Sequence, residues 1–528
     1  MKTRIFILYT GGTIGMAPND PRDPLSPLTP KPLAELLTYV PGFDVDAVAD
    51  EKRFNSDEAK NLARKNKQRD KDERTAFMEM ENGNVIEFGY DSFEKPMDSS
   101  DLTPGYWKRM ATMIAAVYDA YDAFMILHGT DTMAYTSSAL SFMFENLGKP
   151  VVITGSQRPI AAEPSDAVMN FVHAIHVAGY QAAGLPLIPE VVIVFADRIL
   201  RGCRASKTRT KHWAGFDSPN FPWLGRIEEH IVIDAEHVLP PPAPDKTFHV
   251  QTDLDERVFN LSIFPGFSGS QTAKILVDEK TQGVLIRSYG TGNAPSDPAF
   301  LDGIQRAVDA GRLIVNISQC VQGMVEMGLY ETGLGLLERG VLPGFDMTVE
   351  AALTKLMWTL GTRSGQEDRV KQMQIAQRGE QTENLFDLQF GSLDEEEAKD
   401  IYVNPVLPDE RLDRGRISRA VLRISDLGCP QAETGDHIRV KAFMNMPNAD
   451  HQTPLMEERQ IASMEFRYDA EEPVRTRMHN VTHKTQNIIG NGDVSLTLIA
   501  ERKPIDQDDY ESASIFFRSL LIAIYAKV

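Results

Sequence analysis

Two short clusters of glycine and threonine hold the side chains that could do chemistry. The first is Thr10–Gly15 (Thr-Gly-Gly-Thr-Ile-Gly) and the second is His128–Met133 (His-Gly-Thr-Asp-Thr-Met). Taken alone, the first reads as a plain strand-to-loop turn and the second as the capped start of a helix. However, each follows an apolar run, and ligands of a parallel sheet bind where its strands end. The pair therefore predicts that Thr13, Thr130 and Asp131 converge at one edge of a sheet.

Two hydroxyls and a carboxylate in one place suit the hydrolysis of an amide through a covalent intermediate. A threonine hydroxyl is a weak nucleophile until a neighbour takes its proton, and an acyl-enzyme divides one hard step into two easier ones. A proton relay and donors for the oxyanion are also needed. Lys207 is a candidate relay, although from spacing alone a surface lysine in a basic loop explains it more simply. The first cluster lacks the lysine of a phosphate loop and the glycine spacing of a dinucleotide site.

The elements around these clusters predict an α/β domain over residues 1–238. Apolar runs alternate with stretches of helical period, two of which stop at Gly148 and Gly179. Such alternation predicts a large parallel sheet covered on both faces. The expected strands are Ile5–Tyr9, Phe124–Leu127, Val151–Thr154 and Val191–Phe195.

Two segments interrupt this pattern. Residues 17–32 are rich in proline and aspartate and predict an irregular loop. Residues 51–74 carry nine Lys or Arg and six Asp or Glu, so they predict either a solvated helix or a disordered insertion.

The chain is long enough for further domains. The proline-rich run Pro240–Pro244 predicts a stiff connector, followed by a smaller α/β domain over residues 246–385. Residues 386–528 contain short alternating runs separated by turn residues and predict an all-β accessory domain, a β-sandwich. Its last run, 515–525, is compatible with a helix on periodicity alone.

Composition narrows the range of partners and compartments. The formal net charge of −20 argues against nucleic acid and anionic membranes, which need a basic footprint. Three scattered cysteines give no disulfide framework and no zinc spacing. The apolar run at Ile5–Leu8 is too short for a secretory leader, and no stretch approaches a membrane span. We therefore expect a cytoplasmic protein.

The same clusters, with their flanking residues, resemble the two signatures of bacterial-type L-asparaginases, most closely the cytoplasmic type I branch. The resemblance covers about residues 1–385 apart from the charged insertion. It includes four further segments: Met97–Asp101, Val152–Gln157, Arg287–Gly290 and Asp346–Ala351.

This resemblance implies an asparaginase-like fold and roles for named residues. Thr13 matches the nucleophile, and Thr130, Asp131 and Lys207 match a set that assists the second threonine. The implied reaction converts asparagine and water to aspartate and ammonia through a β-aspartyl enzyme, with no metal or cofactor. The substrate-binding positions are Ser99, Ser100, Asp131 and Ser156.

The resemblance also implies assembly and regulation. The family forms homodimers that often pair into homotetramers. Some type I members bind asparagine at a second, allosteric site, and the stretches that match it here include Arg287, Tyr289 and Cys320.

Three departures from the family pattern leave alternatives open. The mobile loop after the first signature usually holds a tyrosine that supports the nucleophile, and residues 17–27 contain none. The insertion at 51–74 and the extension at 386–528 are also unusual. The alternatives are a relative that acts on another amide, such as an asparaginase-like subunit of a tRNA-dependent amidotransferase, and an amino-acid-binding sensor with impaired catalysis.

Overall fold

A computed structural model describes most of the chain: residues 2–18, 28–40, 76–80, 82–327, 331–409, 411–454, 459–468, 474–482, 485 and 494–528. The predicted insertion at 51–74 lies outside these residues. The chain divides into two compact units. The first comprises Met1–Gly333, Val341–Met373 and Gln377–Glu380, and the second comprises Leu334–Gly340, Gln374–Ala376 and Gln381–Val528.

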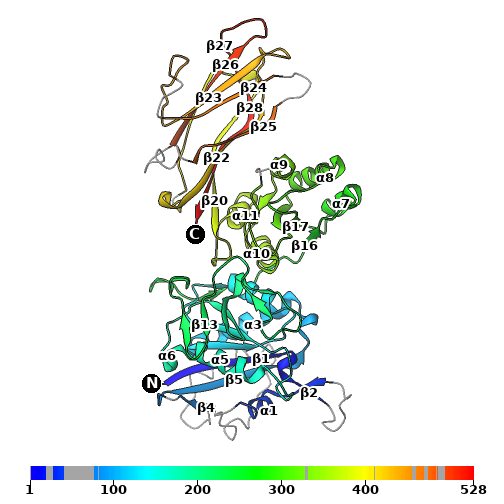
Figure 1. The fold of residues 1–528 in the computed structure, drawn as a ribbon, viewed down its shortest axis with the longest axis vertical. Coiled ribbons are helices and arrows are strands. Elements are labelled where there is room, and N and C mark those ends of the chain that lie inside the picture. The colour runs from blue at the N-terminus through cyan, green and yellow to red at the C-terminus, as the bar shows by residue number, and fades with distance from the viewer. Residues whose placement is uncertain are drawn as a thin grey trace. The chain divides into compact units, whose positions relative to one another are not determined.

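The first unit is built on a nine-stranded sheet in the order β14-β13-β10-β9-β8-β6-β1-β5-β4. Figure 1 labels β13, β1, β5 and β4 of this sheet. The five inner strands of the sheet, from β9 to β5, are parallel neighbours. The bounds are β1 Lys2–Gly11, β4 Ala76–Glu79, β5 Val85–Met97, β6 Ala123–Leu127, β8 Val151–Thr154, β9 Val191–Phe195, β10 Arg198–Arg201, β13 Gly225–Ile227 and β14 Ile231–Ile233.

Apolar strands are buried on both faces of this sheet because helices cover both. Ile5 and Ile7 of β1 pack in a cluster with α5 (Ala167–Ala178), whereas Phe6 and Leu8 pack in another cluster with α3 (Pro104–Val117) and α4 (Met133–Met143). Two-sided burial explains why the strand reads as a continuous apolar run rather than an alternating one. Two short helices complete the layer: α1 Leu33–Leu37 and α6 Tyr180–Ala183.

The α/β prediction is confirmed, but the sheet is mixed rather than wholly parallel. The outer strands β10, β13, β14 and β4 run antiparallel to their neighbours. Short hairpins join β9 to β10, β13 to β14 and β4 to β5, and such connections permit only antiparallel pairing.

Two local expectations also differ from the structure. The irregular loop expected at 17–32 is partly ordered, since β2 (Met16–Pro18) pairs with β3 (Leu28–Pro30). The helix expected to reach Gly148 ends at Met143, and β7 (Phe144–Glu145) follows to pair with β15 (His249–Val250).

A smaller sheet of four parallel strands completes the first unit, in the order β16-β17-β18-β19. Its strands are β16 Val258–Ser262, β17 Gly283–Ser288, β18 Leu313–Ser318 and β19 Leu342–Pro343. The helices along this stretch of chain are α7 Gly269–Leu276, α8 Pro298–Asp309, α9 Glu331–Leu337, α10 Val349–Thr362 and α11 Gln366–Gln374. The domain boundaries expected at 238, 246 and 385 stay predictions.

The second unit is rich in strands, as the alternating runs predicted. One sheet has the order β20-β28-β22-β25, and the other has β21-β26-β23-β24 with β27 beside β26. Inward side chains of both sheets form one apolar cluster. The final run is a strand, β28 (Phe517–Lys527), which pairs with both β20 and β22. The other strands are β20 Glu383–Leu393, β21 Ile401–Val406, β22 Ile417–Leu427, β23 His437–Met444, β24 Gln460–Arg467, β25 Val474–Asn480, β26 Val494–Lys503 and β27 Glu511–Ser512. Across the part of the chain described, no helix is long and apolar enough to cross a membrane.

Candidate active site

Four of the predicted side chains follow the carboxyl ends of four parallel strands. Thr13 comes after β1, Ser99 after β5, Thr130 after β6 and Ser156 after β8, and these strands are neighbours in the sheet. Parallel strands deliver the residues that follow them to the same edge. The sheet order therefore gathers segments that lie far apart along the chain.

Two glycines let the threonine turns touch. Gly12 has a φ of 87°, and a Cβ placed on it would lie 2.3 Å from the Cα of Gly129. A Cβ on Gly129 would lie 2.6 Å from Ser99 Oγ. No side chain fits in such gaps. The absence of Cβ at both positions therefore brings the backbones before Thr13 and Thr130 into direct contact.

Lys207 joins this edge from a separate hairpin. It lies in β11 (Ser206–Lys207), which pairs with β12 (Phe216–Asp217). Its Nζ donates to Thr130 Oγ1 at 2.8 Å and to Asp131 Oδ1 at 2.7 Å. Since the Thr130 oxygen accepts this bond, its own proton is free to be donated elsewhere. The lysine side chain is 19% exposed, whereas that of Asp131 is 62% exposed, so the carboxylate opens to the outside.

Ser99 is tied to the same turn. The Asp131 backbone N–H donates to Ser99 Oγ at 3.2 Å, and Thr132 Oγ1 donates to the Ser99 carbonyl at 2.8 Å. The Thr132 hydroxyl thus fixes Ser99 and does not cap α4, although Thr132 is the N-cap residue. The hydrogen bonds of Ser100 go to Asp98 instead: its N–H and its hydroxyl both donate to Asp98 Oδ1 at 2.9 Å.

Ser156 lies at the same edge of the sheet as the two threonines, but its hydroxyl donates to the backbone of its own loop. It is fully buried and donates to the Arg158 carbonyl at 2.5 Å. The preceding Gly155 lies against the His128 carbonyl, where a Cβ would come within 2.2 Å. The structure therefore brings the segment to the site and leaves the hydroxyl engaged elsewhere.

Buried His128 holds the second threonine turn in shape. Its Nδ1 lies 2.7 Å from the Gly129 carbonyl, and its Nε2 lies 2.9 Å from Thr136 Oγ1. The Thr136 oxygen accepts a separate hydrogen bond from Trp107 Nε1 at 3.0 Å. A carbonyl only accepts, so Nδ1 carries the proton and Nε2 accepts from Thr136. Burial lowers the pKa of His128 to about 4, so the ring is neutral at pH 7. Because both ring nitrogens have partners and the side chain is fully buried, neither nitrogen is open to a substrate, and the ring serves to hold the turn.

Comparison with known proteins decides the family. The model of the N-terminal asparaginase domain matches residues 4–239, and that of the glutaminase/asparaginase C-terminal domain matches residues 257–373. The L-asparaginase 1 of Escherichia coli is 45% identical over 286 residues, which cover 54% of this chain and 82% of that protein. The chain belongs to the asparaginase family.

Two further relatives show the breadth of this family. The L-asparaginase I of Vibrio cholerae, a solved structure, is 35% identical with a TM-score of 0.58, and the match covers 72% of this chain and all of that one. One component of the glutamyl-tRNA(Gln) amidotransferase of Pyrococcus abyssi is 35% identical over 54% of this chain and 65% of that protein. The expected resemblance to type I asparaginases is thereby confirmed.

The three positions expected to bind an effector lie at or just after the carboxyl ends of two neighbouring strands of the smaller sheet. Arg287 and Tyr289 lie at the carboxyl end of β17, and Cys320 follows the neighbouring strand β18. Gln319 Nε2 donates to the Arg287 carbonyl at 2.7 Å, which joins the two strand ends. Cys320 is exposed.

The buried tyrosine nearest the first signature does not hydrogen-bond there. Tyr9 is fully buried, its hydroxyl has no hydrogen-bond partner among the described residues, and a Cβ on Gly15 would lie 1.9 Å from it. Burial raises the pKa of Tyr9 well above its ordinary value, so the group is a neutral phenol. Residues 19–27 of the adjacent loop lie outside the described part of the chain.

One pair near the site was missed from sequence. Ser206, next to Lys207, donates its hydroxyl to both carboxyl oxygens of Glu350 at 2.7 Å. Glu350 lies in the first turn of α10, after the N-cap Thr348. The Thr-x-Glu start of a helix and the family resemblance over Asp346–Ala351 both include Glu350, but neither indicates which residue it contacts.

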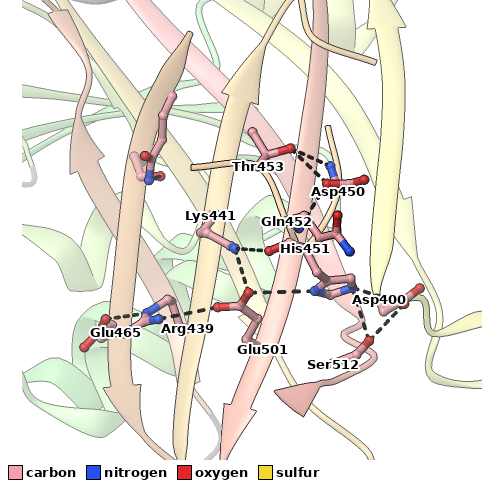
Figure 2. Close-up of polar contacts among 12 residues, drawn as sticks. Asp400, Arg439, Lys441, Asp450, His451, Gln452, Thr453, Glu465, Glu501 and Ser512 are labelled. Carbon is pink, nitrogen blue, oxygen red and sulfur yellow. Dashed lines mark hydrogen bonds and ion pairs between the residues drawn. The ribbon is translucent and has the colours of Figure 1, made fainter. Parts of the chain in front are cut away.

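The second unit holds a polar cluster on its β21-β26-β23-β24 sheet (Figure 2). Lys441 Nζ pairs with Glu501 Oε1 at 2.6 Å, while His451 Nε2 and Ser512 Oγ both contact Asp400 Oδ2, at 3.3 and 2.9 Å. A serine-nucleophile triad needs the carboxylate on the ring nitrogen opposite the serine. Here Ser512 Oγ lies 3.2 Å from Nε2, which Asp400 also contacts. The carboxylate on the opposite side, Glu501 Oε1, lies 3.8 Å from Nδ1, which is beyond hydrogen-bond distance, so the contacts describe a structural network. Among the described residues, no group of three or more His, Cys, Asp or Glu could hold a metal ion.

Proposed function

We propose that this protein hydrolyses L-asparagine to L-aspartate and ammonia through a covalent β-aspartyl intermediate on Thr13. Thr13 Oγ1 forms a bond to the side-chain amide carbon, and the C–N bond of the amide then breaks. The Lys207 ammonium supplies a proton through Thr130 Oγ1 to the departing nitrogen, which leaves as ammonia, and the proton of Thr13 Oγ1 restores the ammonium of Lys207. Water attacks the resulting ester, releases aspartate and restores the Thr13 hydroxyl.

The observation that carries this proposal is the double contact of Lys207 with Thr130 and Asp131 beside the Gly12–Thr13 turn. An ammonium donor on Thr130 Oγ1 leaves the threonine proton available, as a relay requires. The names of the relatives support the same substrate, because two of those described are L-asparaginases.

The same geometry supports specific substrate contacts. The exposed Asp131 carboxylate suits the α-ammonium group of an amino acid. Ser99 Oγ accepts from the Asp131 N–H, so its own proton is free to be donated to the α-carboxylate. Ser100 reaches the substrate only if its hydroxyl leaves Asp98, and Ser156 reaches the side-chain amide only if its hydroxyl leaves Arg158. We include both as substrate-binding positions that rearrange when the substrate binds.

Assembly and regulation form part of the proposal. A homodimer or homotetramer would cover the open side of Asp131 with a second copy of the chain. Arg287, Tyr289 and Cys320 would bind asparagine as an effector, since they lie at adjoining strand ends.

Ammonia and aspartate release from asparagine and from glutamine, with the full chain and Thr13→Ala, tests this function. We expect hydrolysis of asparagine, and a loss of at least about 10³-fold in Thr13→Ala because the nucleophile is removed. Asparagine that binds without turnover would instead support a sensor. Turnover of another amide and none of asparagine would support an amidotransferase-like relative. Equal turnover by both forms would remove Thr13 from the nucleophile's role.

A further inference from the structure

The hairpin that carries Lys207 is short, so something must fix the direction of its side chain. β11 comprises only Ser206 and Lys207 and pairs with the two residues of β12. Successive side chains of a strand point to opposite faces. Ser206 and Lys207 therefore project in opposite directions from one stretch of backbone, and a constraint on one sets the orientation of the other.

Ser206 is constrained by Glu350. Its hydroxyl lies 2.7 Å from each carboxyl oxygen, although the two residues are 144 positions apart in the chain. Glu350 is itself fixed, because it belongs to the first turn of α10, which packs against α4, the helix that follows Thr130 and Asp131. The rigid elements that present Thr130 and Glu350 therefore hold the Lys207 strand from both sides.

The surroundings of Glu350 are polar on several sides. Burial raises the pKa of its carboxyl, while hydrogen bonds from Ser206 and Thr348 and the charge of Arg287 oppose that rise. Burial raises the pKa of Tyr135 of α4, and the same two charges act on it, since Glu350 raises that pKa further and Arg287 lowers it. Burying a carboxyl group without hydrogen-bond partners is unfavourable. The partners of Glu350 offset that cost, so its hydrogen bond with Ser206 is part of what keeps the carboxyl in this place.

We propose that Glu350 is a positioning residue that aims Lys207 at Thr130 and Asp131 by holding the adjacent Ser206. The functional consequence rests on the proposed function, whereas the positioning itself does not. Glu350 touches no reacting atom in this scheme. It acts through the hydroxyl of Ser206 and two residues of backbone.

The variants Glu350→Ala, Ser206→Ala and Glu350→Gln separate this role from a general effect on folding. Glu350→Gln keeps an acceptor oxygen for Ser206 and should retain turnover within about threefold, because a neutral acceptor still holds the hydroxyl. Glu350→Ala and Ser206→Ala should each lower kcat by about 10- to 100-fold with little change in KM, the cost of a misplaced relay. The double alanine variant should be no worse than either single one, since both remove the same contact. Additive losses, or losses confined to KM, would overturn the proposal.

A labelling experiment decides the positioning even without turnover. In the purified full chain, acetic anhydride is reacted briefly with the lysines, and acylation of Lys207 is measured by peptide mass spectrometry. We expect Lys207 to react several times faster in Glu350→Ala and Ser206→Ala than in the wild type. Thr359→Val is the matched control, because it removes a buried hydroxyl of α10 that bonds Met373 and not Ser206.

The two failures are distinguishable. If the wild type does not turn over asparagine, the proposed function fails while the labelling still tests Glu350. If Lys207 reacts at the same rate in every variant, the positioning role fails whatever the activity. A rise in Thr359→Val as large as that in Glu350→Ala would also overturn it, because loosening of α10 would then explain the effect.

Discussion

Replacing Lys207 by methionine should separate catalysis from stability. The ammonium group makes two contacts, to Thr130 Oγ1 at 2.8 Å and to Asp131 Oδ1 at 2.7 Å. If Lys207 is part of the proton relay, its loss should lower kcat by about 10²- to 10⁴-fold, or about 3–5 kcal/mol of transition-state stabilisation. The Asp131 partner is 62% exposed, so screening by water limits the contribution of the ion pair to folding to about 1 kcal/mol or less.

The assay combines steady-state ammonia release with urea unfolding of the same protein. Lys211→Met is the matched control, because Lys211 is an exposed lysine four residues along the chain. We expect full activity and unchanged stability in the control. A Lys207→Met enzyme that keeps its kcat within about threefold of the wild type would refute the relay. A large loss of folding free energy in Lys207→Met would show that the lysine is a structural group.

Three further predictions concern buried groups. Tyr9→Phe should raise the free energy of unfolding by about 1–3 kcal/mol in urea titrations, because it removes a buried hydroxyl without a partner among the described residues; a large fall in kcat would instead give that hydroxyl a part in supporting the nucleophile. The ring of His128 should stay neutral down to about pH 4 in an NMR titration. Because its folded pKa lies below the unfolded value of about 6.5, the unfolded chain binds more protons, and this ring withdraws up to about 3 kcal/mol of stability as pH falls from 6.5 to 4; titration near pH 6.5 would contradict its burial. Lys441→Met should destabilise the second unit by up to about 3 kcal/mol, because buried Glu501 loses its shortest ion pair and keeps only the longer contacts of Arg439 and His451, at 3.5 and 3.8 Å; Lys441→Met with Glu501→Gln should recover much of that loss. Limited proteolysis can follow this unit, and equal stability in the single variant would show that water solvates the pair.

The general arrangement of the site could be predicted from sequence because it follows from one rule. Two apolar runs, each ending in Gly-Thr, indicated two parallel strands, and parallel strands place their ends at one edge. This was sufficient to expect Thr13 near Thr130 and Asp131. The close approach of Gly12 to Gly129 shows why the residue before each threonine is a glycine.

Long-range contacts were beyond the same reasoning. Lys207 lies 77 positions from Thr130 and reaches it from a two-residue strand that no periodicity reveals. From the residues alone, a catalytic Lys207 could not be distinguished from an ordinary surface lysine. Only the family resemblance indicated that Lys207 belongs to the site. Nothing in the sequence indicated the partner of Glu350, because that partner depends on how α10 packs rather than on its neighbours along the chain.

The antiparallel direction of the outer strands, which the sequence did not predict, has a physical cause. The outer strands β10, β13 and β14 have only three or four residues each, so their direction depends on the connecting turns rather than on apolar pattern. The long strands of the second unit were easier to predict from sequence, since one face of each sheet is buried and apolar residues therefore alternate clearly with polar ones. Periodicity left the last run open to a helix, whereas its pairing with β20 and β22 makes it a strand.

The central claim is that Thr13 carries the acyl group. Enzyme mixed with asparagine, quenched in acid during turnover and mapped by peptide mass spectrometry tests it most directly. We expect an aspartyl group on the peptide containing Thr13, lost in Thr13→Ala together with ammonia release. An aspartyl group on Thr130 or any other residue, or undiminished ammonia release by Thr13→Ala, would contradict it.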